Sequence, residues 1–273
     1  MTINCKGNLI DLSQPKIMGI LNITPDSFFD GGKHKDEKAV LKQVERMLTE
    51  GATFIDIGAY SSRPGADPVS EEEELQRILP IVNLLVKEFK DIIISIDTFR
   101  SRIASKCLEN GAALINDISA GLLDKNMLST VAKYKVPYIM MHMKSTPQTM
   151  QRETNYENLI TDIQFYFSQR IAKARNLGIH DLIIDPGFGF AKTLEQNYEL
   201  LKHLEVFQNM NIPLLAGLSR KSMIYKALET DAQNALNGTT ALHMISLQKG
   251  AKILRVHDVK EALECITLNQ QLL

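Results

Sequence analysis

The stretch Ile92-Ile93-Ile94-Ser95-Ile96-Asp97 is an apolar, mostly β-branched run that ends in a carboxylate. The same arrangement, an apolar run leading to polar residues, occurs again at residues 17–21, 54–57, 113–115, 137–141, 182–184, 213–216 and 252–254. Continuous runs of this kind are typical of strands buried on both faces, as in a parallel sheet. Most of the gaps between them are long enough for a crossover helix. The sequence therefore predicts an α/β fold, a (β/α)8 TIM barrel, with its active site at the C-terminal ends of the strands.

The chain length favours one domain. At 273 residues the chain is close to the ~250 residues of a typical barrel of this type, so we expect a single domain over residues 1–273. Residues 2–12 predict a short N-terminal hairpin, with its turn at residues 6–8, lying across the bottom of the barrel. Helices are expected at about residues 36–50, from 70 onward, and at 101–110, 154–177, 193–209, 221–229, 235–249 and 258–268.

Four consecutive glutamates occur at residues 71–74, directly after Ser70. Ser70 followed by Glu73 is a capping-box pattern that predicts a helix start. The run Glu71-Glu72-Glu73-Glu74 could be taken for a metal cluster. We interpret it instead as the first turn of that helix, where acidic side chains complement the helix dipole.

Composition excludes several classes of protein. The chain has 31 Lys plus Arg against 32 Asp plus Glu, so no basic field favours nucleic acid as a partner. Cys5, Cys107 and Cys265 are far apart, which argues against a disulfide framework or a structural zinc site and favours a reducing cytoplasm. We expect no signal peptide before residue 20, and no apolar stretch approaches the ~20 residues that span a membrane.

Two connections after predicted strands stand out. Residues 22–32 and 61–68 combine Pro and Gly with hydroxyl groups, and they hold Phe28 and Arg63 respectively. Both should lie over the barrel mouth. We expect them to act as loops that close on a substrate and exclude water.

A first group of candidate residues would bind a flat polar ring. Asp97, Asn116 and Asp185 follow three different strands, whose ends converge in a barrel. Carboxylate and amide groups can pair with the N–H and amino edge of a heterocycle. The stretch 185–190 adds glycines, which allow close approach, and phenylalanines, which can cover a ring. Lys221 could supply charge or a cation–π contact.

A second group would bind an anion. Arg255 and His257 are two residues apart at the end of the last strand, so they should point to the same side. With Arg63 and Asn22 from neighbouring strands they would form an anion pocket, as barrels often bind phosphate near this edge. His142 and His243 fit neither group, and we expect them to be structural.

The chain resembles the dihydropteroate synthase family in seven blocks that occur in order over about residues 15–260. The first block is Met18-Gly19-Ile20-Leu21-Asn22-Ile23-Thr24-Pro25-Asp26-Ser27-Phe28 with Asp30-Gly31-Gly32, and the second is Ser61-Ser62-Arg63-Pro64-Gly65-Ala66. The later blocks are Asp97-Thr98, Asn116-Asp117, Asp185-Pro186-Gly187-Phe188-Gly189-Phe190, Ser219-Arg220-Lys221-Ser222 and Arg255-Val256-His257-Asp258-Val259.

The resemblance implies a transferase of folate biosynthesis. Members condense 6-hydroxymethyl-7,8-dihydropterin pyrophosphate with p-aminobenzoate, giving 7,8-dihydropteroate and pyrophosphate, and are targets of sulfonamides. The family is usually homodimeric and uses Mg2+.

The family's site residues carry over to matching positions of this chain. Pterin binding is implied for Asp97, Asn116, Asp185 and Lys221. Pyrophosphate binding is implied for Asn22, Ser62, Arg63, Arg255 and His257, and Asn22 is also the implied magnesium ligand. The aminobenzoate pocket is implied for Phe28, Pro64, Phe190, Lys221 and Ser222. Among all of these, we expect the catalytic residues to be Asp97, Lys221, Arg63 and Arg255.

One position departs from the family. Members often have Gly-Glu-Ser-Thr-Arg where this chain has Ala59-Tyr60-Ser61-Ser62-Arg63, so Tyr60 replaces an acid near the second loop. Two alternatives are less favoured. A pterin-binding methyltransferase barrel does not need the anion group or the loops with Phe28 and Pro64, and this chain has all of them. A degenerate homologue, which would bind pterin or support a partner, would be indicated by loss of the loops or of Lys221, and neither is lost.

Overall fold

The computed structural model describes residues 1–23, 33–60, 69–146 and 148–272, with the backbone alone for residues 33–36 and 151. Eight parallel strands close into a barrel in the order β10-β3-β4-β5-β6-β7-β8-β9. These strands are β3 (Lys16–Asn22), β4 (Phe54–Gly58), β5 (Ile94–Asp97), β6 (Leu114–Asp117), β7 (Tyr138–Met141), β8 (Leu182–Asp185), β9 (Leu214–Ala216) and β10 (Ala251–Val256). The predicted (β/α)8 barrel is therefore confirmed.

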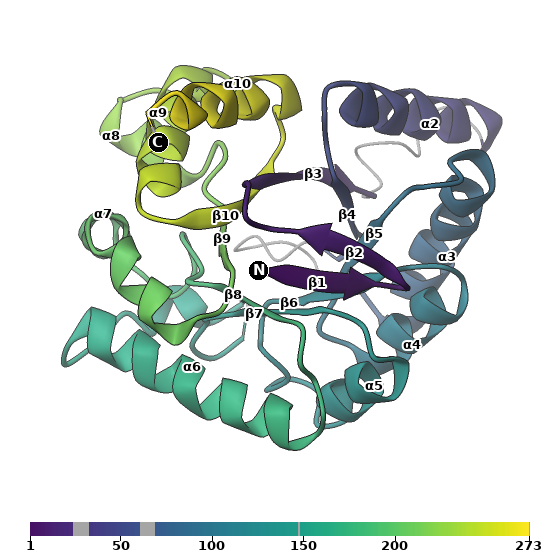
Figure 1. The fold of residues 1–273 in the computed structure, drawn as a ribbon, viewed down its shortest axis with the longest axis horizontal. Coiled ribbons are helices and arrows are strands. Elements are labelled where there is room, and N and C mark those ends of the chain that lie inside the picture. Colours follow the sequence, from purple (N-terminus) through teal and green to yellow (C-terminus); the bar gives the residue numbers. More distant parts are fainter. Residues whose placement is uncertain (24–32, 61–68, 147, 273) are drawn as a thin grey trace.

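Helices surround the barrel and cover its outer face (Figure 1). They are α2 (Lys33–Thr49), α3 (Glu71–Glu88), α4 (Ser101–Glu109), α5 (Met127–Tyr134), α6 (Leu159–Asn176), α7 (Leu194–Lys202), α8 (Ser222–Ala227), α9 (Leu236–Gln248) and α10 (Val259–Gln270). Each barrel strand has one face against these helices and the other inside the barrel. This double burial explains why the strands read as continuous apolar runs.

The N-terminal hairpin closes one end of the barrel. Strands β1 (Thr2–Cys5) and β2 (Asn8–Asp11) pair antiparallel and cross the ring of strands, as Figure 1 shows. Ile3, Cys5 and Leu12 are buried in one cluster with residues from the beginnings of barrel strands, Phe54 and Ile253 among them. The predicted hairpin at the bottom of the barrel is thus confirmed.

Helix boundaries differ from the prediction where local hydrogen bonds intervene. Helix α6 begins at Leu159, later than the predicted residue 154, because the Asn158 side chain accepts from the Thr161 backbone N–H at 3.0 Å and caps the helix. The single helix predicted at 193–209 is instead α7 followed by a 3-10 helix at Leu204–Met210. Helix α5 was not predicted at all.

The acidic run 71–74 forms the first turn of α3, as expected. Ser70 caps this helix by accepting from the Glu73 backbone N–H at 3.2 Å. Glu74 has a further role, because its buried carboxylate accepts from Thr98 Oγ1 at 2.7 Å and pairs with Arg100 at 2.5 Å. In the described part of the chain, no group of three or more His, Cys, Asp or Glu side chains could hold a metal ion.

The three cysteines are free thiols buried in different parts of the fold. Burial raises the pKa of the Cys5 and Cys107 thiols to about 12, and it also raises the pKa of Cys265. Among the described residues, no helix is long and apolar enough to cross a membrane.

Candidate active site

The strand register aligns the candidate polar residues at one rim of the barrel. Across β3, β4, β5 and β6, Asn22 is level with Gly58, Gly58 with Asp97, and Asp97 with Asn116. On the other side of the barrel, Asp185 at the end of β8 is level with Met141. The polar side chains that follow the apolar runs therefore form one layer at the C-terminal ends of the strands, as predicted.

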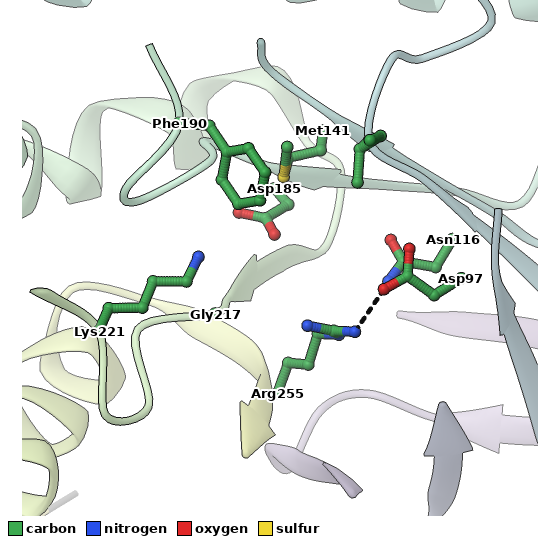
Figure 2. A pocket seen from close by; sticks show the side chains of 9 residues that line it. Asp97, Asn116, Met141, Asp185, Phe190, Gly217, Lys221 and Arg255 are labelled. Atoms are coloured by element: carbon green, nitrogen blue, oxygen red, sulfur yellow. Dashed lines mark hydrogen bonds and ion pairs between the residues drawn. The ribbon is translucent and has the colours of Figure 1, made fainter. Parts of the chain in front are cut away.

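These strand ends enclose a pocket, drawn in Figure 2. It is lined by Asp97, Asn116, Ile118, Met141, Asp185, Phe190, Gly217, Lys221 and Arg255. The carboxylates of Asp97 and Asp185 lie on opposite sides, with Arg255 and Lys221 reaching in from below in this view. The structure thus brings together the whole group that sequence analysis assigned to a flat polar ring, and it adds Arg255.

Arg255 is held by two carboxylates. Its Nε donates to Asp56 Oδ2 and its Nη2 donates to Asp97 Oδ2, both at 2.6 Å. Asp56 Oδ2 also accepts from Asn116 Nδ2 at 2.9 Å. One buried carboxylate therefore orients two of the pocket residues, and Arg255 belongs to the acidic side of the pocket.

Sequence reasoning did not find Asp56. It lies inside the apolar run at residues 54–57, not after it, and its side chain is fully buried. A charged residue inside a strand that is buried on both faces is the signal that could have identified it, because an unpaired charge there would be very unfavourable. Its second oxygen, Oδ1, and Ser95 Oγ have no hydrogen-bond partner among the described residues.

Burial shifts the charges of the pocket toward neutrality. It raises the pKa of Asp97 to about 7, against the opposing effect of the Arg255 guanidinium, and it raises the pKa of Asp185 against the effect of Lys221. Burial lowers the pKa of Lys221 to about 8, although Asp185 opposes this shift. The pKa values of Asp97 and Lys221 therefore lie close to neutral pH, as in sites that bind polar ligands or move protons.

Lys221 and Phe190 form the wall opposite Asp97. The Lys221 ammonium donates to the Phe188 carbonyl oxygen and lies 4.7 Å from the centre of the Phe190 ring. Lys221 is the residue before α8, and Ser222 is the first residue of that helix. Gly217 lies beside Asp185, since a Cβ at this position would be in ordinary contact with Asp185 Oδ2 at 3.5 Å.

The anion group is brought together only in part. His257 is linked to Ser219, with Nδ1 at 3.1 Å from the Ser219 hydroxyl and the backbone N–H donating to it at 3.2 Å. Arg255 instead lies among the acids, and neither His257 nor Asn22 lines the pocket of Figure 2. Four other candidates, Phe28, Ser62, Arg63 and Pro64, lie outside the described residues.

Tyr60, which departs from the family pattern, lies at the end of β4 in a cluster of aromatic and charged groups. Its ring meets that of Phe99 edge-on at 5.2 Å, and the Arg100 guanidinium lies 5.3 Å from the ring centre. Its hydroxyl accepts from Gln148 Nε2 at 2.6 Å. The aromatic ring thus contacts the same arginine that pairs with the buried Glu74 carboxylate.

Comparison with known proteins gives a consistent result. Residues 18–257 match the family model described as pterin binding enzyme. The dihydropteroate synthase of Escherichia coli K12 is 42% identical over 97% of this chain and 94% of its own length, and that of Haemophilus influenzae is 46% identical over 95% and 94%.

Solved structures agree with this result. A Yersinia pestis dihydropteroate synthase, solved with a sulfonamide drug, is 43% identical, covers 100% of this chain and 99% of its own, and superimposes with a TM-score of 0.93. The fold, the acidic pocket and these similarities lead to one conclusion: the chain belongs to the pterin-binding enzyme family and, within it, to the dihydropteroate synthases.

Proposed function

We propose that the chain condenses 6-hydroxymethyl-7,8-dihydropterin pyrophosphate with p-aminobenzoate, forming 7,8-dihydropteroate and releasing pyrophosphate in folate biosynthesis. The observation that carries this proposal is the pocket with Asp97, Asn116, Asp185 and Lys221 in a chain of this family. Solved relatives support this: a Xanthomonas albilineans dihydropteroate synthase was solved with 4-aminobenzoic acid, and a Clostridium difficile one in the presence of pteroic acid.

The pterin ring would lie between the two sides of the pocket. Asp97 and Asp185 can accept hydrogen bonds from ring N–H and amino groups, and Asn116 can both donate and accept. Burial raises the pKa of both acids because it removes water from the carboxylates. Hydrogen bonds donated by a bound ligand would replace that lost solvation and stabilise the ionised carboxylates. Lys221 would contribute a hydrogen bond and charge on the facing wall.

We assign the pyrophosphate to the side of β10, β3 and β4, with Asn22, Ser62, Arg63, Arg255 and His257 as its binding residues. Two carboxylates already balance the charge of Arg255, so it would attract an anion less strongly than an unpaired arginine does.

The donor chemistry at Asn22 suits Mg2+. Asn22 is the last residue of β3, and its amide oxygen is a hard ligand of the type that magnesium prefers. Magnesium bound at phosphate substrates often takes few protein ligands, with phosphate oxygens and water completing the shell. When bound, the ion would neutralise charge that develops on the leaving pyrophosphate.

The aminobenzoate would lie between Phe28, Pro64, Phe190, Lys221 and Ser222. Phe190 supports this placement, because its ring contacts the Lys221 ammonium at the edge of the pterin pocket. A bound aromatic amine would then face the pterin methylene. The two segments with Phe28 and Pro64 would exclude water from the reacting carbon.

We infer an SN1-like reaction. Departure of pyrophosphate leaves positive charge on the pterin methylene, and the Asp97 and Asp185 carboxylates would stabilise that charge through the ring. The aniline nitrogen is already nucleophilic, so no general base is assigned. The position of Asp97 and Asp185 on opposite sides of the pocket supports this role in stabilising the cation.

We further propose a homodimer in the cytoplasm. Exposed apolar side chains on two adjacent helices support dimer formation, because Ile245 on α9 and both Leu263 and Leu268 on α10 would be covered by a second copy. The three buried free thiols support a reducing compartment.

The test is pyrophosphate release by the purified protein, given dihydropterin pyrophosphate and Mg2+, with and without p-aminobenzoate. We expect release to be stimulated by p-aminobenzoate with dihydropteroate as the second product, and to continue slowly without the amine. No release from protein that still binds pterin would contradict the proposal and would favour a binding protein or a methyl-transfer relative. Strict dependence on the amine in single turnovers would contradict the SN1-like step alone.

A further inference from the structure

Lys192 is a buried cation directly behind the pocket. It follows β8 in the segment that leads to α7, and it is 4% exposed. Its ammonium contacts the carbonyl oxygen of Gly187 at 2.9 Å, the carbonyl oxygen of Phe190 at 3.0 Å and Nδ1 of His142 at 3.1 Å. An ammonium has three hydrogens, and here it has three acceptors. Its hydrogen bonding is therefore complete without any ligand.

The segment that it holds is the one that builds a wall of the pocket. Residues Gly187, Gly189 and Ala191 have φ angles of +73°, +82° and +49°, so the chain alternates in and out of the left-handed region. This alternation lets the carbonyl oxygens of residues 187 and 190 reach Lys192, while that of Phe188 accepts from Lys221. Two lysines thus bind one short segment through its backbone oxygens.

We propose that Lys192 is a positioning residue, whose ammonium clamps residues 187–190 to the end of β7 and so sets the Phe190 ring and the Lys221 ammonium for substrate binding. This inference rests on the proposed function for the identity of the substrate. Lys192 does not line the pocket itself. Its effect passes through the Phe190 carbonyl to the ring that forms the pocket wall, and through the neighbouring Phe188 carbonyl to Lys221.

His142 provides the fixed end of this clamp. Its backbone N–H donates to the Asp185 carbonyl oxygen at 2.9 Å, and its ring lies edge-on to Tyr166 at 4.9 Å. Burial, with the charges of Lys192 and Lys144, lowers the pKa of His142 well below its usual value. The ring is therefore neutral, with its proton on Nε2, and Nδ1 is available to accept from the ammonium. A structural histidine thereby acts on the pocket through Lys192.

The clamp should respond to pH. Burial lowers the pKa of Lys192 to about 7; the Asp185 carboxylate opposes this shift, and the Lys221 and Lys144 ammonium groups add to it. A neutral amine has only two hydrogens, so above neutral pH one of the three acceptors loses its donor. The wall carrying Phe190 should then loosen, and substrate binding should weaken as the pH rises through about 7.

The experiment compares Lys192→Met with Tyr156→Phe. Tyr156 is a matched control because its hydroxyl donates to the Ala191 carbonyl oxygen at 2.8 Å, just after the clamped residues 187–190, while Tyr156 itself does not line the pocket. Kinetic constants for both substrates are measured from pH 6 to pH 9, together with hydrogen exchange of the backbone amides of residues 187–192 and the denaturant midpoint.

We expect Lys192→Met to raise KM for dihydropterin pyrophosphate about tenfold, as for loss of a charge-assisted hydrogen bond, with a smaller effect on kcat. The rise in its KM through about pH 7 should be lost, so that only the rise near pH 8 from titration of Lys221 remains, and amides 187–192 should exchange faster. Tyr156→Phe should lower stability but keep the wild-type KM and its pH dependence. A general loss of stability would affect both variants alike.

A second variant covers the case in which Lys192→Met does not fold. His142→Phe keeps the lysine and removes one acceptor, so the rise in KM should start at a lower pH than in the wild type. Unchanged KM and exchange in Lys192→Met, or an unshifted pH profile in His142→Phe, would overturn the inference. Failure of the wild type to form dihydropteroate would contradict the proposed function instead, and the exchange data would still test the clamp.

Discussion

Replacing Asp97 by Asn should make the free energy of unfolding much less sensitive to pH. The Asp97 carboxyl is 20% exposed and lies beside Asp56, with the Arg255 guanidinium paired to both carboxylates. Burial is the main cause that raises the pKa of Asp97; the Arg255 guanidinium opposes this shift and the Asp56 carboxylate adds to it. The amide of an Asn side chain has a similar shape but cannot ionise.

The size of the effect follows from the pKa. Burial raises the pKa of Asp97 from its usual 3.8 to about 7 in the folded protein. Between these values the folded state binds a proton that the unfolded chain has released, so this group stabilises the fold at low pH and loses that contribution as the pH rises through about 7. At about 1.4 kcal/mol per pH unit, and with Asp97 half ionised at pH 7, the difference between wild type and variant should change by roughly 2 kcal/mol between pH 5 and pH 7.

The assay is urea unfolding of the ligand-free protein at pH 5, 6, 7 and 8, for the wild type and for Asp97→Asn. Asp11→Asn is the control, because the Asp11 carboxylate is exposed and hydrogen bonds from Ser13 lower its pKa. Its contribution is present above the usual pKa of an aspartate and is lost only in more acidic solution, so the control should differ from wild type by a constant amount over this range.

The expected direction is that Asp97→Asn gains stability relative to the wild type as the pH rises, while substrate binding is lost. A difference between the two proteins that stays constant from pH 5 to pH 8 would refute the reasoning, since it would mean that Asp97 ionises in the folded protein as it does in water. A difference that changes in the opposite direction would contradict the expected sign.

Two further outcomes are expected. Asp56→Asn should lower the free energy of unfolding by about 3 kcal/mol, because it removes one partner of a buried ion pair. It should also reduce kcat/KM, because Arg255 and Asn116 lose the carboxylate that orients them. Urea unfolding and steady-state kinetics measure the two effects, and wild-type values would contradict the orienting role of this carboxylate. Gly187→Ala should destabilise the protein by at least about 2 kcal/mol, because the backbone of this residue is in the left-handed region and a Cβ would lie 2.2 Å from the His142 carbonyl oxygen. A melting temperature equal to that of the wild type would exclude this close approach.

The sequence predicted the layer of polar residues at the barrel rim because strand ends can be recognised in one dimension. Asp97, Asn116 and Asp185 each follow an apolar run, and in a closed barrel of parallel strands the C-terminal ends of all strands lie at the same rim. The hairpin at residues 2–12 was recognisable for a similar reason, since its turn residues lie between two short runs.

The partners of these residues could not be predicted in the same way. Arg255 was expected to face the same side as His257, but a side chain as long as that of arginine reaches whichever charge is nearest, and here two carboxylates are near. Lys192 was not singled out because lysines are usually solvated. Its burial depends on the path of residues 187–191, which no local pattern specifies.

The three native thiols have a practical consequence for spectroscopy. Cys5, Cys107 and Cys265 are all buried, and each thiol has a raised pKa, so at neutral pH none presents an accessible thiolate. Maleimide or iodoacetamide reagents should therefore leave the folded chain unlabelled. A single cysteine introduced on the surface would accept a fluorophore or spin label by itself, without removal of the native ones.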